Sequence, residues 1–198
     1  MLIEDPVARI RDDRAQARRL DDTGADVCFL ALADSDGRAS VRTLVLREIH
    51  DNRFLLFMNR SSPKWKILSA GSTFELLLWY HSMQRQYRIS GSSQECERDY
   101  VRQSWQRRPR GSKYLDLLYE EIADQSSRIE SREALVEHIK AIRQARDIDD
   151  IDAPEKVAGI EIVADRIEML DLNREDRIHD RQVFTLEDGS WQSTVLVP

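Results

Sequence analysis

Three basic side chains near the C-terminus have a spacing that could build an anion-binding site. Arg177, His179 and Arg181 occupy alternate positions in the sequence. If this segment is a β-strand, the three side chains leave the same face, because residues i and i+2 of a strand share a face. Positive charges this close repel one another unless an anion or a carboxylate joins them. The pattern therefore indicates a negatively charged ligand or an acidic partner residue, although a single histidine near a chain end is more often a surface or core residue.

A second candidate anion site lies at the start of a predicted helix. Ser62 is a typical N-cap residue, Pro63 suits the first helical position, and Gly71 is placed to end the helix. The first turn of a helix offers backbone N–H groups and the positive end of the helix dipole, so a phosphate would be favoured beside Lys64. A solvated surface lysine is the alternative interpretation.

A short arginine-rich stretch stands out in an otherwise acidic chain. The formal net charge is −6, which argues against a general nucleic-acid or anionic-membrane binder. A local basic pocket in such a protein suits a small phosphorylated ligand better than a polyanion. No glycine-rich dinucleotide loop or Walker-type phosphate loop occurs, so a nucleotide would have to be held by side chains and helix ends. The stretch contains Arg102, Arg107, Arg108 and Arg110.

The elements that would position these residues are mostly strands with short turns. Asp188-Gly189 is typical of a hairpin turn between the last two strands. Such a pattern favours an antiparallel barrel over alternating βαβ units. We therefore predict one mainly β domain with helices (α+β) over residues 1–198, with a helical insert at about 95–146 and C-terminal strands at about 157–198. The predicted strands cover 27–33, 39–46, 54–58, 73–81, 85–90, 157–164, 166–172, 182–185 and 191–195; the predicted helices cover 5–20, 63–70, 95–106, 113–123 and 132–146.

The cysteine count and the N-terminal sequence bear on the cellular compartment. Cys28 lies in an apolar run and Cys96 among charged residues, so neither a disulfide framework nor a metal site is expected. The first residues lack the apolar core of a signal peptide, and no run approaches membrane-spanning length. We expect a soluble cytoplasmic protein.

Several short segments, in this order, match one known family. Any one of them would be weak evidence, but their common order and near-constant spacing make chance an unsatisfactory explanation. The segments are RTLVLR at 42–47, FMNRSSPK at 57–64, RQYRISG at 85–91, RPRGS at 108–112, QSSRI at 125–129 and RIHDR at 177–181, followed by Trp191, Leu196 and Pro198. Together they resemble the pyridoxamine 5′-phosphate oxidase family, which implies an antiparallel FMN-binding split β-barrel with peripheral helices.

The resemblance implies FMN as the cofactor. By this resemblance Arg42 and Lys64 hold its phosphate, which requires charge-assisted hydrogen-bond donors. Gln86 is expected at the flavin edge because a primary amide both donates and accepts, although an outward-facing strand glutamine is an equal alternative without the resemblance. The other expected cofactor contacts are Arg47, Phe57, Met58, Ser62, Gln125, Ser126 and Arg181.

The resemblance also implies a substrate site for a phosphorylated pyridine. Arg47, Arg108 and Ser112 would anchor its phosphate, and Arg177 and His179 would hold the ring as the catalytic pair. Some positions depart from the family pattern, mainly around the site. Between residues 112 and 125 the chain is about four residues longer, roughly one helical turn. The residue departures are Ser104 in place of a tyrosine, Leu170 in place of a tryptophan and Pro63 in place of an arginine.

We therefore predict an enzyme, an FMN-dependent oxidoreductase that oxidises pyridoxamine or pyridoxine 5′-phosphate to pyridoxal 5′-phosphate with O2. One alternative is a related flavoenzyme with another substrate, as in the phenazine pathway. Another is a split-barrel protein that carries flavin or haem without oxidase turnover. A homodimer is expected from the resemblance and from the apolar residues of one predicted strand, which exceed the needs of a small barrel interior: Phe74, Leu76, Leu78 and Tyr80.

Overall fold

The structure is a computed structural model that describes residues 5–172 and 175–198. Its α-helices are α1 (Pro6–Arg19), α2 (Pro63–Ser69), α3 (Arg98–Gln106), α4 (Arg110–Glu121) and α5 (Arg132–Ala145), with single-turn 3-10 helices at His81–Met83 and Ile148–Asp150. Its strands are β1 (Val27–Ala33), β2 (Ala39–His50), β3 (Arg53–Asn59), β4 (Phe74–Tyr80), β5 (Arg85–Glu95), β6 (Val157–Asp171), β7 (Asp180–Glu187) and β8 (Ser190–Val195).

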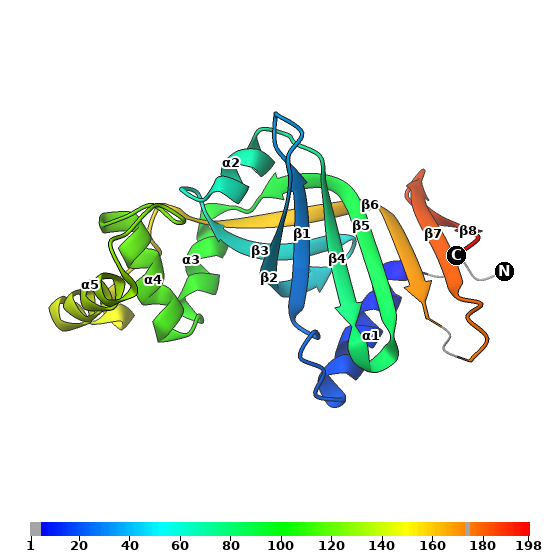
Figure 1. The fold of residues 1–198 in the computed structure, drawn as a ribbon, viewed down its shortest axis with the longest axis horizontal. Coiled ribbons are helices and arrows are strands. Elements are labelled where there is room, and N and C mark those ends of the chain that lie inside the picture. The colour runs from blue at the N-terminus through cyan, green and yellow to red at the C-terminus, as the bar shows by residue number, and fades with distance from the viewer. Residues whose placement is uncertain (1–4, 173–174) are drawn as a thin grey trace. The chain divides into compact units, whose positions relative to one another are not determined.

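The strands form one sheet that closes on itself. Their order is β3-β2-β1-β4-β5-β6-β7-β8, and β3 also pairs with β6. This additional pairing closes the first six strands into an antiparallel barrel and leaves β7 and β8 outside it. The helices α3, α4 and α5 belong to the long connection between β5 and β6 (Figure 1). The predicted antiparallel split barrel with peripheral helices is confirmed.

The barrel interior is filled from one face of each strand. Leu76, Leu78 and Tyr80 of β4 are fully buried, while the residues between them are only partly covered. Tyr87 and Ile89 of β5 are buried in the same alternation. Leu76, Leu78 and Tyr80 are therefore interior packing, and their interpretation as surplus surface for a second subunit was wrong, whereas Phe74 is only partly buried.

Two strands are longer than the sequence pattern predicts. The predicted strands 157–164 and 166–172 are one continuous strand, β6, and β5 continues to Glu95, where a helix was expected to begin. Gly91 explains how β5 passes so close to β6. A Cβ at this position would lie 2.0 Å from the carbonyl oxygen of Val163. Only glycine leaves room for that approach.

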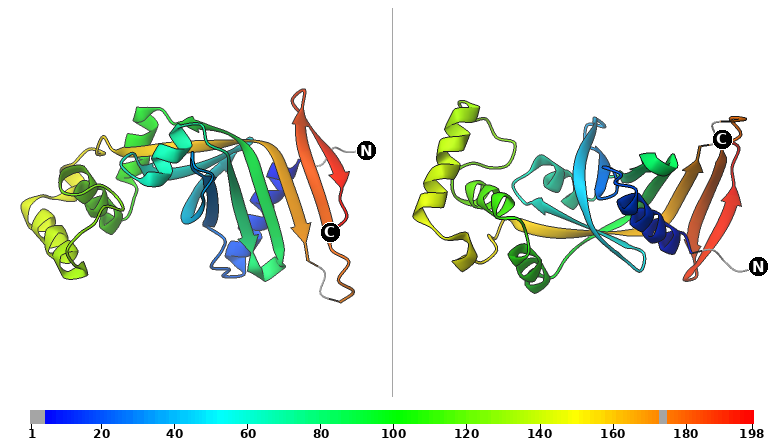
Figure 2. Two further views of the ribbon diagram at one scale, coloured as in Figure 1. Left: turned by 45° about the horizontal axis from the view of Figure 1, so that its top comes forward. Right: turned by 90° about the horizontal axis from the view of Figure 1, so that it is seen from below.

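The hairpin of β7 and β8 has the turn that its sequence predicts. Asp188 and Gly189 both have positive φ, at 50° and 76°. Two successive positive φ values give a turn whose twist matches that of the two strands. The hairpin lies beside the C-terminal part of β6, with which β7 pairs (Figure 2).

Helix α1 is more than a polar surface helix. Besides Ile10, it buries two charged residues, Asp13 and Arg14. Asp13 accepts both Nη1 hydrogen bonds of Arg85, at 2.8 and 2.9 Å, and it also accepts the hydroxyl of Tyr87. Burial first, and then the hydrogen bond to Asp13, raise the pKa of Tyr87, so its hydroxyl remains a proton donor. This network joins α1 to β5.

The chain divides into two compact units, each described separately below. The barrel unit contains the described residues up to Leu56, Gly71–Gln94 and the described part of Glu161–Pro198. The helical unit contains Phe57–Ala70 and Glu95–Ile160, and its core is an apolar cluster around the fully buried Trp105. Across residues 5–172 and 175–198, every helix is too short or too polar to cross a membrane. That the whole chain is a single domain stays a prediction.

Candidate functional site

Helix α2 of the helical unit positions the lysine of the predicted phosphate site. Ser62 caps the helix, since its hydroxyl accepts the Trp65 N–H at 3.3 Å. The side chain of Lys64 is largely buried, and its Nζ donates to Oε1 of Gln125 at 3.0 Å. The structure therefore brings together Ser62, Lys64 and Gln125, which lie up to 63 positions apart in sequence. The solvated-surface interpretation of Lys64 does not hold.

The start of α2 offers fewer backbone donors than the sequence suggested. The helix has seven residues, Pro63 has no N–H, and the Trp65 N–H is already bound to Ser62. Of the first three helical positions, Pro63 and Trp65 therefore have no backbone N–H to offer a ligand. Charge from side chains, rather than the helix dipole, must therefore supply most of the attraction for an anion.

Gln125 is held by residues that the sequence analysis did not single out. Its backbone N–H donates to Ser61 Oγ at 2.9 Å, and its side chain is hydrogen-bonded to the Tyr119 side chain. Burial raises the pKa of Tyr119, partly offset by this bond, so the phenol is protonated at neutral pH. The next residue, Ser126, has a φ of 71°, unusual for a non-glycine residue. Tyr119 lies in the segment between residues 112 and 125 that is about one helical turn longer than in the family. This extra length was the sequence signal that could have pointed to it.

The arginine-rich stretch of the helical unit is largely compensated by carboxylates. Arg108 Nη1 lies 2.6 Å from Oδ2 of Asp116, and the same oxygen accepts the indole N–H of Trp105 at 2.9 Å. Ser104 is buried, and its Oγ has no hydrogen-bond partner within the described ranges. Ser112 lies in the first turn of α4. Arg108 can therefore reach a substrate anion only while it shares its charge with Asp116.

Two of the other arginines of this stretch are also paired with carboxylates. Arg102 contacts Asp99 and Asp152, and Arg110 contacts Asp147 and Asp149. Arg107 is exposed. The compact basic pocket suggested by the sequence is thus a set of separate ion pairs.

In the barrel unit, one outward face of the sheet carries two predicted flavin contacts. Gln86 of β5 lies opposite Trp79 of β4, and Arg181 of β7 lies opposite Leu170 of β6. Directly paired residues of antiparallel strands project from the same side. Tyr87 and Ile89, the neighbours on the other side, are buried, so Gln86 points away from the barrel interior.

A nearly buried carboxylate joins three arginines on this face. Glu168 of β6, with its side chain 5% exposed, contacts Arg181 and Arg166 at 2.9 Å and Arg88 at 3.3 Å. Burial alone would raise the pKa of Glu168, but the hydrogen bonds from Arg166 and Arg181 and the charge of Arg88 lower it overall. Glu168 is an acidic partner of the kind that the spacing of Arg177, His179 and Arg181 required, and it binds Arg181.

Arg177, His179 and Arg181 are not arranged as predicted. Strand β7 begins at Asp180, so Arg177 and His179 lie in the preceding loop rather than on one strand face with Arg181. Arg177 has a φ of 64°, in the left-handed region. A non-glycine residue held there costs about 1–2 kcal/mol, and such strain is concentrated at functional sites. The alternation of Arg177, His179 and Arg181 was therefore a misleading signal for a shared face.

Strand β2 carries the two remaining arginines of the predicted site. Arg42 and Arg47 are both partly buried, and neither forms an ion pair with any residue in the described part of the chain. The Arg42 guanidinium donates only to the neighbouring Val41 carbonyl, at 3.0 Å. A partly buried guanidinium without a carboxylate is suited to binding an anionic ligand.

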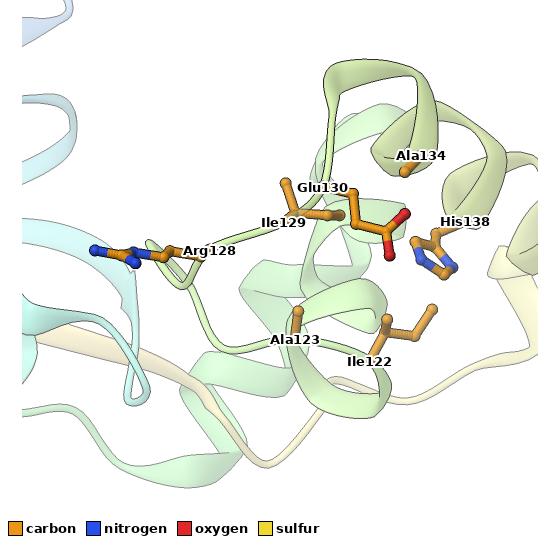
Figure 3. Close-up of a pocket in the computed structure, with 7 residues that line it drawn as sticks. All are labelled: Ile122, Ala123, Arg128, Ile129, Glu130, Ala134 and His138. Atoms are coloured by element: carbon orange, nitrogen blue, oxygen red, sulfur yellow. The ribbon is translucent and has the colours of Figure 1, made fainter.

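Phe57 and Met58 lie at the end of β3, in the helical unit. Phe57 packs against the apolar cluster of that unit, and Met58 is buried. A pocket of about 680 Å³ lies elsewhere in the same unit; the Glu130 carboxylate is turned toward the His138 imidazole, and Arg128 is turned away (Figure 3). Its lining includes Ile122 and Ile129 but no residue of the predicted site.

The fold defines the class of protein: an antiparallel split barrel with a helical insertion. A family model described as pyridoxamine 5′-phosphate oxidase matches residues 16–146, more than half of the chain. The chain belongs to the pyridoxamine 5′-phosphate oxidase family.

Curated relatives agree with this assignment. The chain is 29% identical to the pyridoxine/pyridoxamine 5′-phosphate oxidase of Erythrobacter litoralis (strain HTCC2594), covering 98% of this chain and 91% of that protein. It is 31% identical to the enzyme of the same name from Trichormus variabilis, covering 85% of this chain and 77% of that protein.

Solved structures share the fold at lower identity. PhzG from Burkholderia lata 383, in complex with tetrahydrophenazine-1-carboxylic acid, has a TM-score of 0.86 at 22% identity and covers 98% of this chain and 93% of its own. A pyridoxamine 5′-phosphate oxidase-related, FMN binding protein from Nostoc punctiforme PCC 73102 has a TM-score of 0.77 at 17% identity, covering 100% of both chains.

Proposed function

We propose that the protein is an FMN-dependent oxidase that converts pyridoxamine or pyridoxine 5′-phosphate to pyridoxal 5′-phosphate with O2. The observation that carries this proposal is the cluster of Ser62, Lys64 and Gln125, which the family resemblance assigns to FMN and which the fold brings together. A largely buried ammonium group beside a primary amide, at the start of a helix, has the chemistry that a dianionic phosphate requires.

The other residues fit the same cofactor. Arg42 has a guanidinium without an ion-pair partner in the described chain, as a phosphate ligand needs. Gln86 offers both a donor and an acceptor to a flavin edge. When bound, FMN would supply the redox chemistry. For pyridoxine 5′-phosphate, the alcohol CH2OH becomes the aldehyde CHO while O2 becomes H2O2. For pyridoxamine 5′-phosphate, the CH2NH2 group and one H2O give CHO and NH3, while O2 again becomes H2O2.

The protein's own residues would bind and orient the substrate. By the family resemblance, Arg47 is expected to bind its phosphate. Arg108 and Ser112 of the helical unit are expected to do so by the same resemblance, although Arg108 is already paired with Asp116. Arg177 and His179, in the loop before β7, would hold the pyridine ring. None of these side chains has to be a strong base, because the carbon–hydrogen bond is broken by hydride transfer.

The test is to purify the protein, measure its flavin absorbance, and assay peroxide with each phosphorylated vitamer and its unphosphorylated counterpart. We expect about one flavin per chain and turnover of the phosphorylated forms. A protein that neither contains nor binds flavin would refute the proposal.

Arg47→Ala separates substrate binding from turnover. Loss of one charged hydrogen-bond donor costs about 1.5–3 kcal/mol, so KM for the phosphorylated vitamer should rise roughly tenfold to a hundredfold while kcat changes little. Arg38→Ala, which removes an exposed arginine before β2, is the matched control. An unchanged KM in the Arg47 variant would remove this residue from the phosphate site.

A second candidate function is supported by the pair of Arg108 and Asp116. Because Asp116 already neutralises Arg108, the helical unit offers a substrate less positive charge than its arginine content suggests. A related flavin oxidoreductase whose substrate carries less negative charge would need no more positive charge than this. Turnover of a carboxylate substrate such as a reduced phenazine carboxylic acid, with none for the phosphorylated vitamers, would favour this candidate.

We also propose that the protein is a homodimer. Val41 and Val45, 61% and 46% exposed, lie on the outward face of β2 with Thr43 between them. Burying the same patch of two chains around a two-fold axis would remove this apolar surface from water. The double substitution Val41→Glu and Val45→Glu should reduce the mass in light scattering from twice the chain mass of 23.1 kDa to that mass.

Leu20→Glu is the control for the dimer experiment. Leu20 is also an exposed apolar residue, 53% exposed, at the end of α1. We expect this variant to keep the wild-type mass. A wild-type protein that is monomeric with flavin bound would contradict the dimer.

A further inference from the structure

The outward face of β4 to β7 carries five charged side chains that contact one another. They comprise two carboxylates and three guanidinium groups, which leaves one positive charge in excess. Glu168 is the only one of the five that is almost fully buried, and it touches all three arginines. Glu75 lies at the edge and contacts Arg88 alone. We call this set the Glu168 cluster: Glu75, Arg88, Arg166, Glu168 and Arg181.

Glu168 binds one edge of the Arg181 guanidinium and leaves the other edge open. Both Nε and Nη2 of Arg181 lie 2.9 Å from Oε1 of Glu168. The Nη1 group has no hydrogen-bond partner among the described residues. Fixing a long arginine side chain costs up to about 2 kcal/mol of rotamer entropy, and a ligand need not meet this cost when the protein has already done so.

The cluster also lies beside the other predicted flavin contact. Arg88 follows Gln86 by two residues on β5, so the two side chains share a strand face. Glu168 therefore connects the arginine next to Gln86 with Arg181 across β6. A flat ring with electron-rich carbonyl and nitrogen edges suits a face that carries fixed guanidinium donors and one excess positive charge.

We propose that Glu168 is a positioning residue, which acts through Arg181 to hold the isoalloxazine ring of the flavin. This inference rests on the proposed function, because it takes flavin as the ligand. It predicts an effect on the ring and not on the phosphate, so riboflavin and FMN should respond alike.

The experiment compares Glu168→Gln with Glu75→Gln in the flavin-free protein. Each variant removes one carboxylate from Arg88, but only the first removes the partner of Arg181. Dissociation constants for FMN and for riboflavin come from quenching of flavin fluorescence. We expect Glu168→Gln to weaken both ligands by the same factor, roughly tenfold, and Glu75→Gln to remain within about twofold of wild type.

The possible failures can be told apart. If the wild type binds neither flavin, the proposed function fails and this inference with it. If the wild type binds both while Glu168→Gln binds within twofold of it, or loses affinity for FMN alone, only the role of Glu168 is overturned.

Two further variants guard against a purely structural effect. The pair Arg166→Gln and Glu168→Gln keeps the net charge of the cluster, and it serves if the single variant does not fold. In an Arg181→Gln background, Glu168→Gln should have no further effect on flavin affinity, because the residue it acts through is gone. Additive losses in that cycle would overturn the proposal, whatever the change in thermal stability.

Discussion

Lys64→Met is expected to weaken FMN binding about a hundredfold while riboflavin binding changes by less than about threefold. A charged hydrogen-bond donor to a phosphate contributes about 3 kcal/mol at the upper end, and riboflavin has no phosphate to lose it. Methionine fills most of the space of the buried lysine stem, so the substitution removes the charge with little loss of packing. Titration of both ligands into the flavin-free variant, followed by fluorescence, measures the difference.

Lys66→Met is the matched control for this experiment. Lys66 lies on the same helix two residues later, but its side chain is exposed. We expect its two dissociation constants to remain close to those of the wild type. If the Lys64 variant loses FMN and riboflavin equally, Lys64 supports the site in general and does not bind the phosphate.

Asp13→Ala is expected to lower the free energy of unfolding by about 3 kcal/mol. The substitution leaves the largely buried Arg85 with Asp171 as its remaining carboxylate partner among the described residues, and it removes the acceptor of the Tyr87 hydroxyl. Removing one partner of a buried charge pair typically costs 3–5 kcal/mol, and the retained contact with Asp171 places the expected value at about the lower end. Urea unfolding followed by circular dichroism gives the free energy directly.

Asp12→Ala tests whether this loss comes from the network or from the change of charge. Asp12 precedes Asp13 on α1 and is exposed. Its substitution should change the free energy of unfolding by no more than about 0.5 kcal/mol. Comparable losses in the two variants would mean that the contacts of Asp13 with Arg85 and Tyr87 contribute little.

Most of the secondary structure could be predicted because it depends on neighbours in the sequence. Ser62 and Pro63 begin a helix through contacts within four residues, and the Asp188-Gly189 pair forms its turn from its own backbone preferences. Family motifs with constant order likewise predict the barrel from the sequence alone. Such signals are local, or repeat along the chain at fixed spacing.

The family resemblance also predicts which residues hold a cofactor phosphate, but the sequence does not show what surrounds them. Lys64 meets Gln125 across 61 positions, and Arg85 meets Asp13 across 72. Sequence patterns that extend over a few residues cannot predict contacts between residues so far apart in the chain. Alternation on β4 shows that its residues point to two sides, but only the closure of the barrel decided that Leu76 and Leu78 point inward.

The charged residues show the difference most clearly. The sequence alone predicted that Arg177, His179 and Arg181, on one strand face, would need an acidic partner or an anion. The tertiary structure decided that Arg181 has Glu168, that Arg108 has Asp116, and that β7 begins too late to align the other two. The physical reason is that the fate of a charge depends on which opposite charges the fold brings within a few ångströms, and strand pairing, rather than sequence spacing, sets those distances.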